Sequence, residues 1–269
     1  MELRTRMMYD VLSENRIKSV LKTKLMGKKI YAFWSIGTTN DFAYLRATQD
    51  EPEGALVIAE KQERGRGRKA RTWDSQFGKG LWFSIILRPD LPSNKSGLIP
   101  YLAGVSVAQA VEKIIGLRPD LKWPNDLLLN GKKFCGILSD VQFDNGNIAF
   151  IILGIGVNVN HNPAEWSAEV NPIATSLRIE SNRRIDRAEM LAEILACLER
   201  NYEKFKADGM GEILDQWKQR CPTFKKNITV LQEKQKLTGL FFDLDEEGCL
   251  VLKANDGKMI KIITGDIII

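Results

Sequence analysis

The chain has 269 residues, of which 44% are hydrophobic and 27% charged, and its formal net charge is +5. This length suits one large or two modest domains, and the composition is typical of a globular protein with a sizeable core. The mild positive charge permits contact with polyanions but does not require a nucleic acid as partner. The N-terminal sequence lacks the apolar core of a signal peptide, and no run of 18 apolar residues occurs. We therefore expect a soluble, cytoplasmic protein without membrane contact.

The cysteines and the histidine limit the available chemistry. Four cysteines stand at positions 135, 197, 221 and 249, far apart and without a C-x-x-C pair, and the single histidine, His161, is near none of them. Zinc sites and disulfide frameworks are therefore excluded, and we expect reduced core thiols. One histidine also makes hydrolase triads and histidine-rich metal sites improbable. We predict no metal site built from a side-chain cluster.

The first half of the chain predicts alternating helices and strands. Residues 10–24 favour a short basic helix with a single apolar stripe, and there is no room for a helix-turn-helix before the first strand. For this reason we do not expect DNA binding. Apolar, β-branched runs predict strands over 29–34, 54–60 and 80–87, and apolar residues at helical spacing predict a helix over 100–115.

Two hairpins and a long helix are predicted next, and the sequence pattern changes beyond residue 220. The Asn130-Gly131 and Asn145-Gly146 pairs predict two tight hairpins, and KWPND (122–126) is expected to open a strand. The spacing of Asp186 and Glu189 predicts a capped helix over about 186–206. Beyond residue 220 only short strands and turns remain. We thus predict an α/β domain over residues 1–220, with a short helical segment at 1–27, and a small β-barrel over 221–269.

The segment RGRGRKAR (64–71) places five cations in eight residues. Gly65, Gly67 and Ala70 fit a relaxed dinucleotide-binding pattern, but the helix that this fingerprint requires does not follow, so we reject that reading. A solvated basic loop and a nucleic-acid contact remain as alternatives. Alternating glycines that let the backbone approach an anion, together with Trp73, on which a purine can stack, favour a loop that binds nucleotide phosphates. We call residues 64–73 the arginine loop.

A second cluster lies across the first predicted hairpin. Antiparallel pairing around Asn130-Gly131 brings Asp126 and Lys133 near one another. Asp126 could simply be a turn former, and Lys133 a solvated cation on a strand. Beside a phosphate-binding loop, they are also candidates for catalysis.

Four motifs together resemble the biotin protein ligases: GRGRKARTW (65–73), KWPND (122–126), KKFCGIL (132–138) and GIGVNVN (154–160). They occur in the order and rough spacing of that family, and the segments TTN (38–40) and EKQE (60–63) are similar to its biotin-site segments. The resemblance covers roughly residues 29–265. It implies a catalytic domain like that of class II synthetases, with a mixed or antiparallel central sheet, followed by an SH3-like β-barrel. It also implies the monofunctional type, which lacks an N-terminal DNA-binding domain.

The resemblance assigns roles to individual residues. For catalysis it implies Lys133, Arg68 and Asp126, of which Asp126 is a candidate to assist deprotonation of the incoming amine. For biotin binding it implies Thr38, Thr39, Asn40, Gln62, Arg66, Gly67, Arg68, Lys133, Gly136, Gly154 and Gly156. For the nucleotide it implies Arg66, Arg68, Arg71, Trp73, Asn125 and Asn158.

The implied reaction uses ATP, biotin and Mg²⁺. Biotin attacks the α-phosphate of ATP to give biotinyl-adenylate, and a lysine of a biotin carboxyl carrier domain then takes the acyl group. Mg²⁺ is expected to bind mainly through the triphosphate, with Asp126 as a possible ligand. A homodimer is possible. The alternatives are a lipoate- or octanoate-transferring ligase and a non-enzymatic, DNA-binding biotin sensor. Ala70 stands where the family usually has glycine, and Thr38 where serine is commoner.

Overall fold

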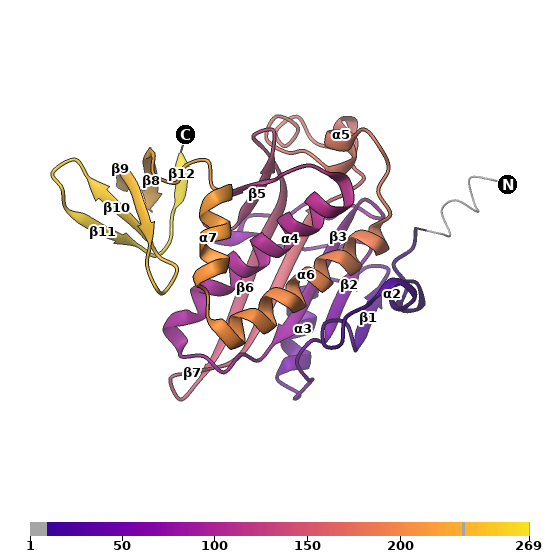
Figure 1. Ribbon diagram of the computed structural model, residues 1–269. Helices are drawn as coiled ribbons and strands as arrows, with labels where there is room; N and C mark the ends of the chain where they lie inside the picture. Colours follow the sequence, from indigo (N-terminus) through magenta and orange to yellow (C-terminus); the bar gives the residue numbers. More distant parts are fainter. Residues whose placement is uncertain (1–9, 233–234, 269) are drawn as a thin grey trace.

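The computed structural model describes residues 10–232 and 235–268 and contains two sheets (Figure 1). The larger is a seven-stranded mixed sheet in the order β1-β2-β3-β7-β6-β5-β4, in which β1 and β2 are parallel and the other neighbours antiparallel. This confirms the expected α/β class. The strands span Ile30–Phe33 (β1), Leu56–Ala59 (β2), Gly80–Leu87 (β3), Asp120–Lys122 (β4), Asp126–Leu129 (β5), Lys132–Asp144 (β6) and Asn147–Asn158 (β7).

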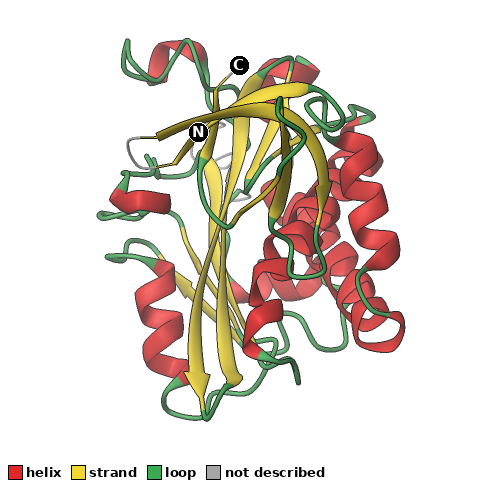
Figure 2. Cartoon of the chain, turned by 90° about the vertical axis from the view of Figure 1, so that its left-hand side faces the viewer, coloured by secondary structure: helices red, strands yellow, loops and turns green. Residues whose placement is uncertain are grey.

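Helices cover the two faces of this sheet unequally (Figure 2). The long helices α4 (Ile99–Ile115), α6 (Arg187–Asp208) and α7 (Gly211–Arg220) lie on one face, and α3 (Thr39–Ala47) packs on β2, β3 and β7 from the other. The helices predicted over 100–115 and 186–206 are confirmed as α4 and α6, and the Asp186 side chain accepts a hydrogen bond from the Glu189 amide as the capping spacing indicated. Shorter helical segments are α2 (Glu14–Val20), η1 (Arg68–Ala70), η2 (Ser93–Leu98), η3 (Pro163–Glu165) and α5 (Leu177–Ser181).

Both predicted hairpins are present. Asn130 and Gly131 have φ of 49° and 76°, and Asn145 and Gly146 have φ of 48° and 84°, which is the left-handed pair that two-residue hairpins require. KWPND opens β5 only with its last residue, Asp126, while its first residue, Lys122, ends β4. Its middle residues, 123–125, form the turn between β4 and β5, because Pro124 has no amide proton to give to a sheet.

The second sheet is antiparallel, with the order β11-β10-β9-β8-β12. Its core is continuous with that of the first unit, because Trp217 of α7 packs against both Tyr101 of α4 and Phe241 of the second sheet, with ring centroids 5.1 and 6.5 Å apart. This shared core fixes the β unit beside the turn at 123–125. The strands span Asn227–Gln232 (β8), Gln235–Leu244 (β9), Leu250–Ala254 (β10), Met259–Ile262 (β11) and Asp266–Ile268 (β12).

The N-terminal region is described only from residue 10. The helix expected within 10–24 is α2, and the rest of the segment predicted over 1–27 lies partly outside the described residues. Within the described residues, one helical stretch, Ser93–Ile115, is long and apolar enough to cross a membrane, but 67% of its apolar window is buried in the protein. It thus packs as a core helix.

Candidate active site

A cavity of about 890 Å³ opens between the arginine loop, the start of α3, the middle of β6 and β7, and the end of the second sheet. Every residue that the sequence singled out lines it. These are Thr38, Thr39, Asn40, Gln62, Arg66, Gly67, Arg68, Arg71, Trp73, Asn125, Asp126, Lys133, Gly136, Gly154, Gly156 and Asn158. The sequence motifs, up to 120 positions apart, therefore meet at one site.

One end of the cavity is walled by buried, mutually bonded polar side chains. The Gln62 side-chain oxygen accepts hydrogen bonds from the Thr39 amide (2.8 Å) and hydroxyl (3.1 Å). Ser84 of β3, which sequence reasoning missed, lies 2.7 Å from the Thr39 hydroxyl and 2.6 Å from the Asn40 side-chain oxygen. Thr38 caps α3 by accepting a hydrogen bond from the Asp41 amide. The start of α3 is thus held rigidly against the sheet.

Glycines form the floor of the cavity. A Cβ at Gly154 would lie 2.2 Å from the Asn40 side-chain oxygen, and one at Gly156 or Gly136 would lie 2.6 or 2.9 Å from the Trp73 indole. The absence of side chains at these strand positions leaves room for Asn40 and for the indole to approach the sheet. Any larger residue would fill the cavity from below.

The arginine loop folds back over the cavity. Lys69 and Ala70 have φ of 54° and 56°, so both occupy left-handed conformations that cost an alanine more than a glycine. Ala70, which the resemblance predicts to replace a glycine, thus adopts a backbone conformation that glycine reaches at lower cost. At the other end of the loop, Arg66 pairs with Asp41 at 2.5 Å and lies 3.7 Å from Asp140.

The second sheet holds the arginine loop in place, a contact that sequence reasoning missed. Asp266 of β12 pairs with Lys69 (3.0 Å) and Arg71 (2.7 Å), and the Thr264 hydroxyl accepts a hydrogen bond from Arg68 (2.8 Å). Burial raises the pKa of Asp266, but the hydrogen bond from Lys69 and the charge of Arg71 outweigh it and hold that pKa below its ordinary value. Asp266 is therefore ionised at neutral pH and ties the loop to the β unit.

We expect Asp266→Ala to loosen the arginine loop. The loop contains the peptide bonds that trypsin cleaves, and exposed, mobile loops are cut first. Limited trypsin digestion followed by mass spectrometry should show faster cleavage within residues 64–71 than in the wild type. Asp256→Ala, which changes an aspartate in a turn of the same unit, is the control and should be cut at the wild-type rate. Equal cleavage of all three proteins would contradict the role of Asp266.

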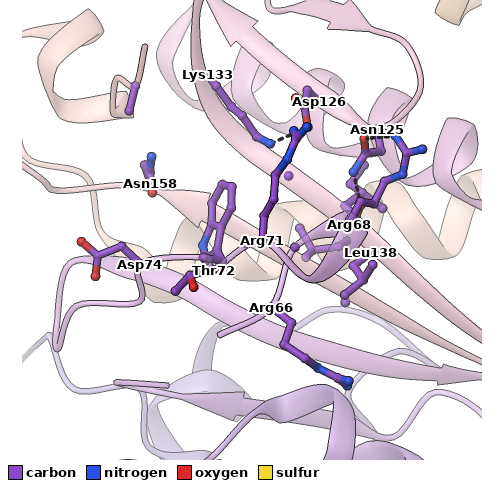
Figure 3. A pocket seen from close by; sticks show the side chains of 18 of the residues that line it. Arg66, Arg68, Arg71, Thr72, Asp74, Asn125, Asp126, Lys133, Leu138 and Asn158 are labelled. Carbon is purple, nitrogen blue, oxygen red and sulfur yellow. Dashed lines mark hydrogen bonds and ion pairs between the residues drawn. The ribbon is translucent and has the colours of Figure 1, made fainter. Parts of the chain in front are cut away.

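Two cations face the middle of the cavity (Figure 3). Lys133 Nζ lies 2.6 Å from Asp126 Oδ1, so the predicted proximity is present, although the register sets Lys133 opposite Leu128. The same Nζ lies 5.1 Å from the centre of the Trp73 ring. Arg68 donates to the Asn125 side-chain oxygen at 3.2 Å, and the Asn125 amide in turn donates to the Ile137 carbonyl. Burial lowers the pKa of the Arg68 guanidinium. Arg66, Lys69 and Arg71 are paired with carboxylates, and Arg64 does not line the cavity. Among the described loop residues that line the cavity, Arg68 is therefore the cation whose charge is left for a bound anion.

The far end of the cavity is closed by the loop of residues 162–175. Its Trp166, Val170 and Ile173 line the cavity, and its backbone bonds to Lys133, whose amide donates to the Ile173 carbonyl (2.9 Å). Asn158 donates its side-chain amide to the Thr175 carbonyl (3.1 Å), so it holds this loop to the end of β7. Sequence reasoning missed the loop; a tryptophan among polar residues was its one signal.

Comparisons with known proteins agree with this geometry. Residues 33–158 match the Biotin/lipoate A/B protein ligase family, and residues 223–269 match the Biotin protein ligase C terminal domain. The Bifunctional ligase/repressor BirA of Bacillus subtilis is 39% identical over 260 residues, which cover 95% of this chain and 78% of that protein. This chain belongs to the biotin protein ligase family.

Further family members support the assignment. The Biotin--[acetyl-CoA-carboxylase] ligase of Mycobacterium tuberculosis is 31% identical over 238 residues, covering 86% of this chain and 85% of that protein. The structure of the biotin protein ligase from Aquifex aeolicus in complex with biotin and ATP has a TM-score of 0.76 and 28% identity, and covers 90% of this chain and 98% of that one. The family match thus extends over both sheets of this biotin ligase.

Proposed function

We propose that this chain activates biotin with ATP and transfers it to a lysine of a biotin carboxyl carrier domain. The observation that carries the proposal is the placement of Lys133 and Arg68 at the middle of a cavity with a buried polar pocket at one end and tryptophans at the other. In this arrangement the biotin rings occupy the pocket of Thr39, Asn40 and Gln62. The nucleotide lies towards Trp73 and Asn158, and the two reacting anions meet beside the cations.

The first step needs those cations. A carboxylate oxygen of biotin attacks the α-phosphate of ATP, a P–O bond to biotin forms, and pyrophosphate leaves. Two anions repel one another, and fixed positive groups aimed at the charge of the transition state reduce that barrier without reorganisation. Lys133 is a compact charge suited to the contact between carboxylate and phosphate, and Arg68 offers a planar fork to the phosphate. Arg66 and Arg71 close the loop over the adenylate, which keeps water from the reactive acyl phosphate.

The second step needs a base. The carrier lysine attacks the acyl carbon of biotinyl-adenylate, an amide bond forms, AMP leaves, and the amine must lose a proton. Asp126 is within 2.6 Å of Lys133 and so stands where the acyl group lies. We assign it to receive that proton, with Asn125 beside it orienting the phosphate.

Mg²⁺ fits this site through ATP rather than through a protein cage. Asp126 and Asp266 both line the cavity, but each is paired with a cation of the chain. Among the described residues the one clustered donor set is Asp245, Glu247 and Cys249, and Lys261 is bonded to its carboxylates. The ion would therefore be held by phosphate oxygens and water, where it would neutralise charge on the leaving pyrophosphate.

We expect Gly154→Ala to weaken biotin binding at least about tenfold, because the new Cβ displaces the Asn40 side chain from its bond with Ser84 and an unpaired buried polar group costs about 1–3 kcal/mol. Isothermal titration with biotin measures this. Gly104→Ala is the matched control, since a Cβ there has no neighbour closer than 3.6 Å. Unchanged biotin affinity in Gly154→Ala would place the rings elsewhere.

One experiment tests the proposed function. The protein is incubated with ATP, Mg²⁺, biotin and an isolated carrier domain, and intact mass should show one added biotinyl group on the carrier. Lipoate or octanoate in place of biotin should add nothing, whereas addition of either would favour the acyltransferase alternative.

We also propose that the protein works in the cytoplasm without binding DNA. A gel shift with biotin and ATP present that retains DNA would favour the regulator, and sedimentation tests the possible homodimer.

A further inference from the structure

Four aromatic rings form a continuous row between the arginine loop and the 162–175 loop. Ring centroids are 6.4 Å apart for Trp73 and Trp82, 5.9 Å for Trp82 and His161, and 5.2 Å for His161 and Trp166. The last pair is nearly parallel, at 20°. The two outer rings line the cavity, whereas the two inner rings lie behind it. We call these four residues the aromatic row.

The inner rings of the row are attached to fixed backbone. Trp82 belongs to β3, is wholly buried, and donates its indole N–H to the Gln76 carbonyl. The His161 carbonyl accepts a hydrogen bond from the Ser176 hydroxyl at 2.8 Å, and the preceding Asn160 exchanges two hydrogen bonds with the Ile185 backbone. Rings on such backbone provide a rigid surface for the outer two.

The 162–175 loop has few other attachments. From residue 162 to 172 the backbone–backbone hydrogen bonds of the loop are internal among the described residues. Its polar links to the rest of the chain there are the Glu165 carbonyl, which accepts from the Gln76 side chain, and the Glu165 carboxylate, which pairs with Lys79. Trp166 therefore supplies the aromatic contact by which this stretch is seated. Few attachments to the body of the protein are typical of segments that open and close.

His161 is an unusual residue for this place. It is 0% exposed, and neither ring nitrogen has a hydrogen-bond partner. Buried polar groups in proteins normally have partners, and an unpaired one calls for a reason. Burial lowers the pKa of His161 to about 4; Glu165 and Asp74 oppose this shift and Lys79 adds to it. The row as observed is thus formed with a neutral imidazole, which Trp166 covers on one face.

We infer that His161 is a positioning residue that seats Trp166, and through it the 162–175 loop, against the nucleotide end of the cavity. The inference rests on the proposed function, because it assigns ATP to that end. His161 touches no substrate. It acts by stacking, and it couples the seating of the loop to Trp82 and hence to the arginine loop through Trp73.

Binding of an uncleavable nucleotide tests the stacking. α,β-Methylene-ATP and biotin are titrated separately into the wild type, His161→Leu and His161→Phe by isothermal titration calorimetry. We expect His161→Leu, which keeps volume but not the ring, to bind the nucleotide about fivefold more weakly and biotin unchanged, since an aromatic pair contributes a factor of about two to ten. His161→Phe keeps the ring and should remain within about threefold of the wild type. Phe205→Leu, a buried aromatic of α6 outside the row, is the control for lost stability and should bind normally.

The pH dependence gives a readout that a purely structural histidine would lack. With the loop open, His161 is hydrated and titrates near its ordinary pKa of about 6.5. Below that pH, seating the loop must release a proton, so the nucleotide affinity of the wild type should fall by up to about tenfold per pH unit relative to His161→Phe. Comparing the two proteins cancels the titration of the nucleotide itself.

Three results would overturn the inference. Normal nucleotide binding by a thermally destabilised His161→Leu would make His161 a core residue only. A parallel loss of nucleotide and biotin affinity would indicate general loosening, and equal pH profiles of the wild type and His161→Phe would exclude the proton coupling.

The proposed function can fail separately. If the variants show the predicted differences in nucleotide affinity but the wild type transfers no biotin to a carrier, the function alone is refuted. A wild type that binds no nucleotide would refute both.

Discussion

Lys133→Ala should abolish the transfer of biotin to a carrier domain, with a loss of at least about 10²–10³ in the rate of adenylate formation, the range for removal of one preorganised donor. The loss has two sources. The positive charge beside the reacting phosphate disappears, and the Asp126 carboxylate, which Lys133 neutralises at 2.6 Å, is left to repel the incoming anions. Biotin-dependent exchange of pyrophosphate into ATP measures this step without a carrier.

Lys132→Ala is the matched control for Lys133→Ala. Lys132 is the preceding residue of the same strand, but it is exposed and lies outside the cavity. Its removal should leave the exchange rate within about twofold of the wild type, as for surface changes away from a site. Lys133→Ala should weaken binding of free biotin much less than it slows exchange, because the rings are proposed to bind at Thr39 and Gln62 and only the carboxylate would lose its contact. If Lys133→Ala retains more than a tenth of the exchange rate, the central role of this residue is wrong.

Arg187→Met should destabilise the whole protein by about 3–5 kcal/mol, the usual cost of breaking a buried ion pair by removing one partner. The Arg187 guanidinium is 2% exposed and bonds to Glu60 at 2.7 Å, as well as to the carbonyl oxygen of Gly80 and to Asp10. Without it Glu60, 3% exposed, becomes an uncompensated buried charge. Urea unfolding measures the free energy of unfolding.

Two further variants separate this pair from its surroundings. Arg184→Met removes the neighbouring arginine, which is 61% exposed and also pairs with Asp10, and should change stability by less than about 1 kcal/mol. The double variant Arg187→Met, Glu60→Met should recover much of the lost stability, because it removes both buried charges. If the double variant loses as much free energy of unfolding as the two single variants lose together, the destabilisation comes from packing rather than from charge.

Much of the fold follows from local sequence patterns. The hairpins at Asn130-Gly131 and Asn145-Gly146 and the strand at 80–87 formed as predicted, because turn residues and apolar runs act over a few positions. Helices α4 and α6 were also predicted, since each has a broad apolar stripe and α6 a side-chain cap. These signals depend only on neighbouring residues.

Two helices gave no such signal. The buried face of α3 consists of Thr39, Asn40, Ala43 and Ala47, so it faces the sheet with small and polar groups instead of an apolar stripe. In α7 only Ile213 and Trp217 are buried. Both helices are specified by what they pack against, and a sequence pattern does not show the partner surface.

The sequence likewise predicted one part of the site and missed another. The candidate site residues taken from the motifs all line one cavity, because each motif lies on a strand or loop whose place in the sheet is fixed. Asp266 and Trp166 were missed. Asp266 follows Arg71 by 195 positions, in a strand of isoleucines, and the packing between the two units, in which α7 takes part, brings it to the loop. A contact of that range has no local pattern by which to find it.

The late position of Asp266 in the chain also orders events during synthesis. Strand β12 follows every other element that borders the cavity. At about 5–20 residues per second, the ribosome adds Asp266 about 10–40 seconds after Arg71. Until then Lys69 and Arg71 lack the carboxylate with which they pair. We therefore expect a chain still on the ribosome to lack the contacts by which the second sheet holds the arginine loop over the cavity, and the finished protein to be the first form that has them.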